Sequence, residues 1–127
     1  MTDPFADRLR SEGVARAESA REVVASAEMV FLCLPSGKEV ESVVEDAGLL
    51  QAAKAGQVVV DLGTSPVRLA RRLAAELEHR GAAFADAPIA RTREAAQRGT
   101  LSVMVGARPQ VFARIEPLLR CFATDVT

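Results

Sequence analysis

The stretch Met29–Lys38, which reads Met-Val-Phe-Leu-Cys-Leu-Pro-Ser-Gly-Lys, decides the fold of this sequence. Its first six residues are apolar. Such a run is too short to span a membrane, and because it does not alternate with polar residues it predicts a strand buried on both faces, as in a parallel sheet. Ser36 and Glu39 then have the spacing of a capping box, so we expect a helix to begin where this strand ends.

Two further segments predict strands of the same sheet. Gln57–Leu62 contains three consecutive valines, and Ala83–Ala87 is a shorter apolar segment closed by a proline. The longest predicted helix lies between them, opened by Ser65 and Pro66, with leucines that repeat every four residues. Alternating strands and helices predict a parallel sheet built by right-handed crossovers. The carboxyl ends of the strands then meet at one edge, where open α/β sheets bind ligands.

The remaining segments add smaller elements. Leu101–Val105 indicates a fourth strand, and Val14–Glu18 a brief, weak one. The arginine-bearing connection Ile89–Gly99 is expected to be a polar loop that contains a helical turn. A last helix begins at Pro109, and Pro117 inside it predicts a kink or a restart.

The composition fits a single α/β domain over residues 1–127. Of the 127 residues, 49% are hydrophobic and 26% charged, which is enough for one core but too little chain for two ordinary domains. The net charge is -1 without a block of like charges, which argues against nucleic-acid and membrane partners and favours small soluble ones. Because no apolar run is of signal or membrane type, we expect a soluble, cytoplasmic protein.

Three residues that invite a chemical role receive a structural interpretation. Cys33 and Cys121 have no Cys or His at metal-ligand spacing, so we expect reduced packing residues and no metal site. His79, the only histidine, falls in the last turn of the longest predicted helix, where it complements the helix dipole. We therefore predict no catalytic or metal role for any of the three.

Four motifs occur in a specific order. They are Met29-Val-Phe-Leu-Cys-Leu-Pro-Ser, Val58-Val-Val-Asp-Leu-Gly-Thr-Ser-Pro, Asp86-Ala-Pro-Ile and Gly99-Thr-Leu-Ser-Val-Met-Val-Gly. In this order and spacing the chain resembles the β-hydroxyacid dehydrogenases, the group of 3-hydroxyisobutyrate dehydrogenase, tartronate semialdehyde reductase and 6-phosphogluconate dehydrogenase. The resemblance covers nearly the whole chain and implies a partial Rossmann-type NAD(P)-binding domain.

The resemblance also implies cofactor contacts. The Leu-Pro contact of the family falls on Leu34 and Pro35, a further contact falls on Glu39, and the threonine contact after the next strand falls on Thr64. Leu34 and Pro35 are also explained as a strand end and a turn, and the capping role alone accounts for Glu39. For Thr64, helix capping and cofactor contact are compatible.

The sequence departs from the family pattern in three places. The fingerprint G-x-G-x-x-G is absent, so the first strand-helix-strand unit of the fold is expected to be missing. The family's substrate loop continues Ser-Gly-Gly, where this chain has Ala90, Arg91 and Thr92; Arg91 is either a carboxylate ligand or a solvated side chain. The family's catalytic lysine has no counterpart, because Lys38 and Lys54 lie outside matching motifs, and no catalytic residue is predicted.

Two functional hypotheses follow. The favoured one is a cofactor-domain fragment, truncated at both ends relative to a reductase of small hydroxyacids or semialdehydes, which binds NADP or NAD weakly or not at all and has no turnover alone. The rival is a non-catalytic interaction module, or one half of a split enzyme. In either case the missing first strand would leave Met29–Leu34 as an open apolar edge, which predicts self-association through that edge.

Overall fold

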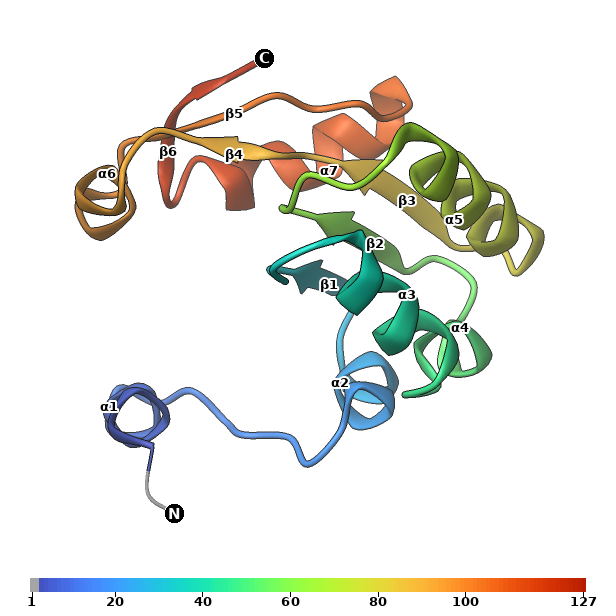
Figure 1. Ribbon diagram of the computed structural model, residues 1–127, viewed down its shortest axis with the longest axis horizontal. Coiled ribbons are helices and arrows are strands. Elements are labelled where there is room, and N and C mark those ends of the chain that lie inside the picture. The colour runs from blue at the N-terminus through green and yellow to red at the C-terminus, as the bar shows by residue number, and fades with distance from the viewer. Residues whose placement is uncertain (1–2) are drawn as a thin grey trace.

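Three parallel strands form the centre of the computed structural model, which describes residues 3–127 (Figure 1). They are β1 (Met29–Leu32), β2 (Val58–Asp61) and β3 (Ala83–Asp86), in the order β1-β2-β3. Val30 lies opposite Val59 in the first pair, and Val59 opposite Phe84 in the second. The predicted parallel sheet with its three successive strands is confirmed, and so is the α/β fold class.

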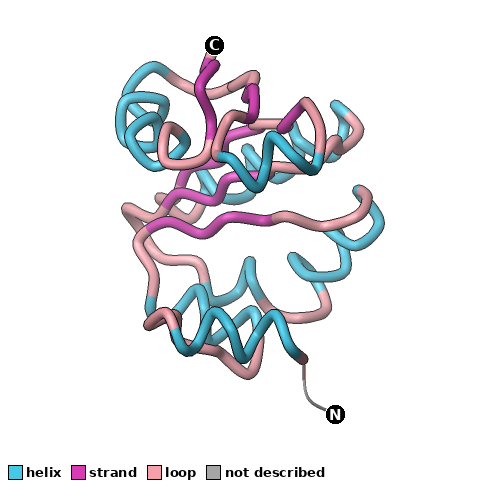
Figure 2. The backbone as a smooth tube through the Cα atoms, turned by 90° about the vertical axis from the view of Figure 1, so that its left-hand side faces the viewer, coloured by secondary structure: helices cyan, strands magenta, loops and turns pink. Residues whose placement is uncertain are grey.

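Helices lie on both sides of these strands (Figure 2). They are α1 (Pro4–Ser11), α2 (Ala20–Ser26), α3 (Gly37–Glu45), α4 (Leu49–Ala52), α5 (Val67–His79), α6 (Arg93–Arg98) and α7 (Pro109–Leu119). Side chains of a strand alternate between faces, so Val59 packs in the core that contains α5, whereas Val58 and Val60 pack in the core that contains α7. None of the helices within residues 3–127 is both long and apolar enough to cross a bilayer.

Strand β1 corrects the prediction of a strand buried on both faces. Only Val30 and Leu32 are buried, while Met29 and Phe31 on the other face are half-buried at the margin of the α7-side core. All four residues of β2 are buried instead. The physical reason is position, because β1 has only β2 as a neighbour among the described strands, whereas β2 lies between two strands and under helices on both faces.

A second sheet follows the first. It consists of β4 (Ile89–Ala90), β5 (Leu101–Val103) and β6 (Ala123–Val126), with β4 antiparallel and β6 parallel to β5. One antiparallel bridge joins the two sheets, in which Asp86 N–H donates to the Gly106 carbonyl at 3.0 Å and Gly106 N–H donates to the Asp86 carbonyl at 2.6 Å. The predicted fourth strand is β5, which is shorter than expected. The predicted loop after β3 contains a short strand as well as the helix α6.

Several sequence predictions were wrong in this structure. Val14–Glu18 is a loop, since no strand lies alongside it within residues 3–127. Helix α7 continues through Pro117 without the predicted restart. The proline falls in the last turn, so the backbone donor that it lacks interrupts the helix only near its end. Cys33 and Cys121 are exposed rather than packed, since each lies just beyond the end of its strand or helix.

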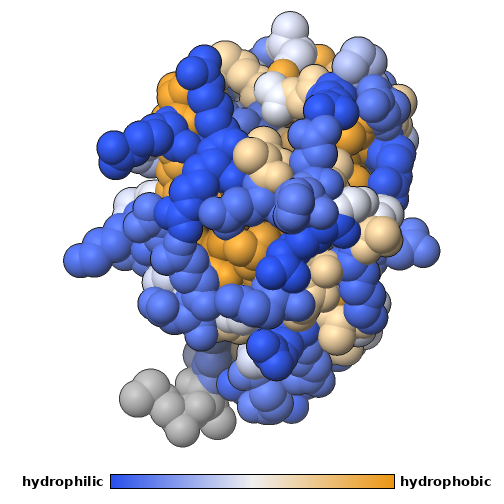
Figure 3. Space-filling model, turned by 90° about the vertical axis from the view of Figure 1, so that its right-hand side faces the viewer, coloured by the Kyte–Doolittle hydropathy of each residue, from blue (hydrophilic) through white to orange (hydrophobic). Residues whose placement is uncertain are grey.

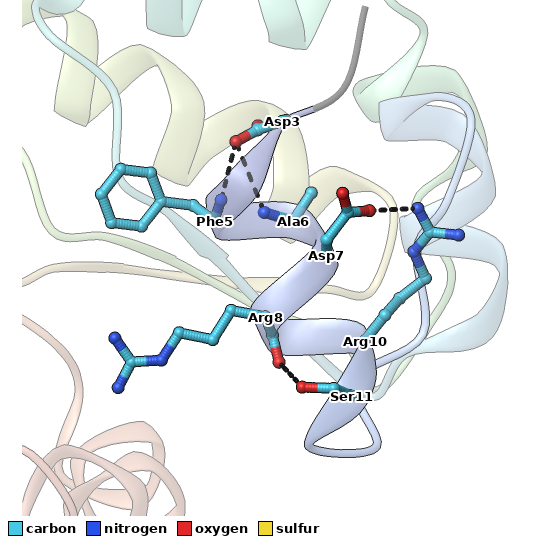
Figure 4. Close-up of polar contacts among 7 residues, drawn as sticks. All are labelled: Asp3, Phe5, Ala6, Asp7, Arg8, Arg10 and Ser11. Carbon is cyan, nitrogen blue, oxygen red and sulfur yellow. Dashed lines mark hydrogen bonds and ion pairs between the residues drawn. The ribbon is translucent and has the colours of Figure 1, made fainter.

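Helix α1 stands apart from the sheet (Figures 1 and 2). Its polar contacts are internal: the Asp3 carboxylate accepts hydrogen bonds from the N–H groups of Phe5 (3.0 Å) and Ala6 (3.4 Å), as Figure 4 shows. Asp3 is thus the cap of α1, and the proline that follows it occupies the first turn, a pair typical of helix starts. No residue of α1 is buried, and Phe5 and Leu9 are 76% and 50% exposed. The apolar side of α1 therefore has no partner within residues 3–127.

Candidate functional site

The carboxyl ends of β1, β2 and β3 lie side by side and form a rim. Backbone hydrogen bonds continue past the strands and hold the rim together. Leu62 N–H donates to the Leu32 carbonyl at 2.8 Å, and Ala87 N–H donates to the Asp61 carbonyl at 2.8 Å. Leu34, Pro35 and the loop to α5 therefore start from fixed positions, at the edge where open parallel sheets bind ligands.

Two glycines allow the elements at the rim to approach each other closely. A Cβ atom on Gly63 would lie 3.2 Å from the Leu34 carbonyl oxygen, so the loops after β1 and β2 nearly touch there. A Cβ atom on Gly37 would lie 2.7 Å from the Pro66 ring, closer than packed atoms tolerate. The beginnings of α3 and α5 are consequently drawn together at the rim. Helix beginnings present unpaired N–H groups, which suit the oxygens of a phosphate or a sugar.

Asp61 shapes the loop that carries Thr64. Its side chain is fully buried and accepts hydrogen bonds from Gly63 N–H at 2.9 Å and from the Ser65 hydroxyl at 2.6 Å. Ser65 was expected to open α5, but the bond to Asp61 takes its hydroxyl, and the cap position falls on Pro66. Thr64, held between the two anchored residues, is exposed at the rim. Its hydroxyl forms no hydrogen bond with the described residues and is free to meet a ligand.

The Ser36–Glu39 pair differs from the predicted capping box. The Ser36 hydroxyl donates to the Glu39 carboxylate, and it makes no hydrogen bond to the backbone of α3. The hydrogen bond from Ser36 lowers the pKa of Glu39, with a further contribution from a backbone N–H. The start of α3 also favours the negative charge. Glu39 is thus an ionised acceptor at the rim, which suits a ribose hydroxyl and would repel a phosphate.

Asp86 ends β3 beside the buried Asp61. The two residues occupy paired positions of neighbouring parallel strands, so their side chains leave the sheet on the same face. Partial burial raises the pKa of Asp86, and the nearby charge of Asp61 raises it further. Neither aspartate was singled out from the sequence. The available signal was a single acidic residue at the end of each apolar strand, followed at Asp61 by the turn residues Gly-Thr-Ser.

The predicted substrate loop lies on the second sheet. Ala90 ends β4 opposite Ser102, and the Thr92 hydroxyl caps α6 by accepting a hydrogen bond from Ala95 N–H at 3.1 Å. Arg91 lies between them and is exposed. Its guanidinium donates to the carbonyl of Thr100, just before β5, and to the hydroxyl of Thr124 in β6. The structure thus groups the predicted residues in two sets, one on the rim and one on this loop.

One cavity in the described part of the chain has none of the predicted site residues in its lining. Its volume is about 520 Å³, and it occupies the outer side of β3 between α5 and α7, with Phe84 and Val111 among the residues that line it. A smaller cavity of about 450 Å³ adjoins the rim and is lined by Ser36, Gly37 and Pro66. Figure 3 shows one side of the molecule, where apolar surface is visible only in patches between hydrophilic side chains. The rim itself is an open edge rather than an enclosed pocket.

His79 lies in the last turn of the longest helix, as the sequence predicts. It is the last residue of α5 and is exposed, at the opposite end of the helix from the rim. Within residues 3–127 no group of three or more His, Cys, Asp or Glu side chains is arranged to hold a metal ion.

Comparison with known proteins places this geometry among dinucleotide-binding domains. The family model for the NAD binding domain of 6-phosphogluconate dehydrogenase matches residues 1–127. The 2-hydroxy-3-oxopropionate reductase of Escherichia coli (strain K12) is 33% identical over 126 residues, which are 98% of this chain and 43% of the reductase.

Two solved structures share the fold. Mycobacterium tuberculosis 3-hydroxyisobutyrate dehydrogenase with L-serine matches 96% of this chain and 41% of that one, with a TM-score of 0.87 and 33% identity. Psf3 in complex with NADP+ and 2-OPP matches 96% of this chain and 44% of that one, with a TM-score of 0.85 and 32% identity. This chain therefore spans less than half the length of these relatives.

Proposed function

The chain belongs to the family of NAD-binding domains of 6-phosphogluconate dehydrogenase, and we propose that it is the dinucleotide-binding part of an NAD(P)-dependent oxidoreductase acting on small hydroxyacids or semialdehydes. The observation that carries the proposal is the convergence of α3 and α5 at the ends of β1 and β2, where Gly37 and Gly63 remove the side chains that would separate them. NADP+ in the related Psf3 and the names of the other relatives support the cofactor and substrate classes.

Each proposed contact at the rim has a chemical role. The exposed Thr64 hydroxyl forms no hydrogen bond with the described residues. It is therefore available to exchange a hydrogen bond with an oxygen of the nucleotide. The ionised Glu39 accepts a hydrogen bond from a ribose hydroxyl. Leu34 is half-buried and Pro35 exposed, and together they offer an apolar surface to the flat face of a ring. This set contains no cation, so the pyrophosphate would need other partners, and we expect weak binding.

Nucleotide titration of the ¹⁵N-labelled chain tests the proposal. We expect NADH and NADPH to shift the amide resonances of residues 34–39 and 62–65 saturably, with a Kd on the order of 1 mM. Thr64→Val should weaken binding several-fold, whereas Ser26→Ala, a change in α2 far from the rim, should leave it unaltered. Shifts confined to other parts of the chain, or equal binding by both variants, would remove the rim from the cofactor site.

We also propose that this chain alone has no turnover. The two lysines, Lys38 and Lys54, lie at the start of α3 and beyond α4, and Lys54 donates to the Ala25 carbonyl at 3.2 Å. Neither belongs to the substrate loop Ala90–Thr92. An assay with 3-hydroxyisobutyrate and 2-hydroxy-3-oxopropionate, with both nicotinamide cofactors, should show no oxidation or reduction. Measurable turnover that survives repurification would contradict this part of the proposal.

A second candidate function, an interaction module, is favoured by the β1 side of the molecule. The outer edge of β1 has no strand partner within residues 3–127, and α1 presents the exposed side chains of Phe5 and Leu9. An unpaired strand edge is a template for another strand. We propose that this edge pairs with a second copy of the chain, or with a protein that supplies a complementary strand and helix.

Sedimentation velocity across a range of concentrations tests this association. We expect the wild-type chain to associate and Met29→Lys, a change in the half-buried side chain at the start of β1, to shift it to monomer. Leu118→Lys, at an exposed position of α7, is the matched control and should associate like the wild type. A wild-type monomer at every concentration would refute the association.

A further inference from the structure

Arg91 adopts a backbone conformation that favours glycine. Its φ angle is +90°, and it is the only non-glycine residue in the described part of the chain with a positive φ. The side chain of an L-residue crowds its own backbone there, so such positions persist only where other contacts enforce them. In this chain the strained residue lies in the middle of the loop Ala90–Thr92.

Both neighbours of Arg91 are fixed independently. Ala90 is held in β4 by its pairing with Ser102, and Thr92 is the cap of α6. The chain therefore turns from β4 into α6 at Arg91, the residue with the left-handed backbone.

The guanidinium of Arg91 crosses the second sheet. Its Nη1 donates to the Thr100 carbonyl oxygen at 2.8 Å and to the Thr124 hydroxyl at 3.3 Å. Thr100 precedes β5, and Thr124 lies in β6. One nitrogen therefore links the residue after β4 to β6 and to the residue that precedes β5.

Thr124 is itself irregular. Leu101 pairs with Ala123 and the next residue, Ser102, pairs with Asp125, so Thr124 is an extra residue in β6. Extra residues of this kind bend a strand and redirect a side chain. Here the redirected hydroxyl meets the guanidinium of the strained residue. The two irregularities thus share one hydrogen bond across β5.

We infer that Arg91 is a positioning residue, which holds the loop Ala90–Thr92 in its left-handed conformation through Thr100 and Thr124. This inference rests on the proposed function for the loop's role toward a substrate. It assigns the guanidinium to contacts within the protein, with Thr100 and Thr124, and not to a substrate carboxylate. Two bonds from Nη1 fix the direction of the guanidinium toward β5 and β6, which is why it acts as a brace.

Variants at Arg91 separate the effect of its left-handed backbone from the effect of its two side-chain hydrogen bonds. Arg91→Gly removes both hydrogen bonds and also the strain, whereas Arg91→Ala removes the bonds and keeps the strain. In the 127-residue chain we expect Arg91→Ala to unfold at a clearly lower urea concentration than Arg91→Gly. Arg91→Lys retains one donor and should fall between wild type and Arg91→Ala. Equal urea midpoints for the glycine and alanine variants would overturn the inference.

NMR amide signals report on the contact between Arg91 and Thr124, which a urea midpoint does not identify. Arg91→Ala and Thr124→Val should both shift the amide signals of Thr92 and Thr100, because both break the same brace from opposite ends. Ser102→Ala, which breaks a neighbouring bond to Asp125, is the control and should leave the Thr92 signal in place. If Thr124→Val leaves the loop signals unchanged, the brace is absent, and this holds even where Arg91→Ala fails to fold.

A carboxylate probe distinguishes this inference from the proposed function. With 3-hydroxyisobutyrate, a brace predicts that Arg91→Gly keeps the affinity of wild type within about threefold, whereas a direct carboxylate contact predicts a loss of about tenfold or more. The second result would overturn the inference. Absence of nucleotide binding at the rim would instead refute the proposed function, while the urea midpoints and the Thr124→Val signals would still decide the role of Arg91.

Discussion

Strands β1 and β2 are alike in sequence but differ in burial. Each is a run of apolar residues that leads into a turn at the rim, yet β2 is buried on both faces and β1 on one. The difference comes from their neighbours, since β2 lies between β1 and β3 and receives helices on both sides. An apolar run therefore predicts a strand, but the strand's place in the sheet decides how much each side chain contributes to stability.

The largest effect on stability is expected for substitutions at two side chains that lie opposite each other. Val60 of β2 is fully buried, and its partner in the register, Phe31 of β1, is half-buried. Val60→Asp places an unpaired carboxylate in the core and should cost about 4 kcal/mol or more, enough to unfold the chain. Phe31→Asp should leave a folded protein, because its carboxylate can reach water. Circular dichroism during urea titration measures both. Loss of folding by both variants alike would show that β1 is no more tolerant than β2.

The next largest effect on stability is expected in the turns that follow these strands. At the end of β2 the Asp61 carboxylate holds both Gly63 and Ser65, whereas at the end of β1 the Ser36 hydroxyl donates to Glu39 and does not cap the backbone of α3. Asp61→Ala should cost about 2–3 kcal/mol, because a partly buried N–H group and a hydroxyl lose their acceptor.

Ser65→Ala is the matched control for Asp61→Ala, since it removes one of the two donors and leaves the carboxylate paired with Gly63. It should cost about 1 kcal/mol. Urea midpoints and the exchange rate of the Gly63 amide report the difference. If Ser65→Ala proved as costly as Asp61→Ala, the hydroxyl rather than the carboxylate would organise the turn.

The sequence predicts the sheet and the rim better than the contacts made there. The valines of Val58–Val60 and the leucines of α5 are local patterns, and they led to the observed strands and helix. By contrast, β4 has two residues and exists only because it pairs with β5, which no local pattern reveals. The acceptor role of Asp61 was missed for a similar reason. A buried aspartate is stable only with particular partners, and Ser65 had a competing interpretation as a helix cap.

Among the site residues, too, some positions could be predicted from local sequence patterns and others could not. The positions of Leu34, Pro35 and Thr64 on the rim follow from parallel strands of known order, so the sequence could place them. The conformation of Arg91 could not be predicted, because it depends on Thr124, which lies 33 positions away and is displaced by a local irregularity of β6. Contacts of this kind become visible only when the sheet is assembled.

The pH dependence of stability sharpens the comparison between the ends of β3 and β1. The raised pKa of Asp86 means that the folded state binds its proton more tightly than the unfolded state, where the ordinary value is 3.8. This contribution to stability is fully present below pH 3.8 and is lost as the pH rises through the folded pKa. Asp86→Asn should therefore stabilise the chain at neutral pH relative to wild type, and the advantage should disappear toward pH 3.8. Urea midpoints between acidic and neutral pH check the sign, and an asparagine variant that is less stable at neutral pH would contradict it.

Glu39, at the end of β1, should show the opposite sign. Its hydrogen bond from Ser36 lowers the folded pKa below the ordinary 4.5, so the contribution is present above pH 4.5 and is lost as the pH falls through the folded value. Ser36→Ala should return the pKa of Glu39 toward 4.5, while Ser42→Ala, one turn further along α3, should leave it in place. The titration of the Glu39 side-chain carbonyl carbon by NMR measures this directly. Glu39 is also the proposed ribose acceptor, and its carboxylate stays ionised at neutral pH in both variants. Ser36→Ala therefore tests whether this charge is sufficient for nucleotide binding, or whether Ser36 must also orient the carboxylate. Unchanged NADPH shifts at residues 34–39 in Ser36→Ala would show that the charge is sufficient.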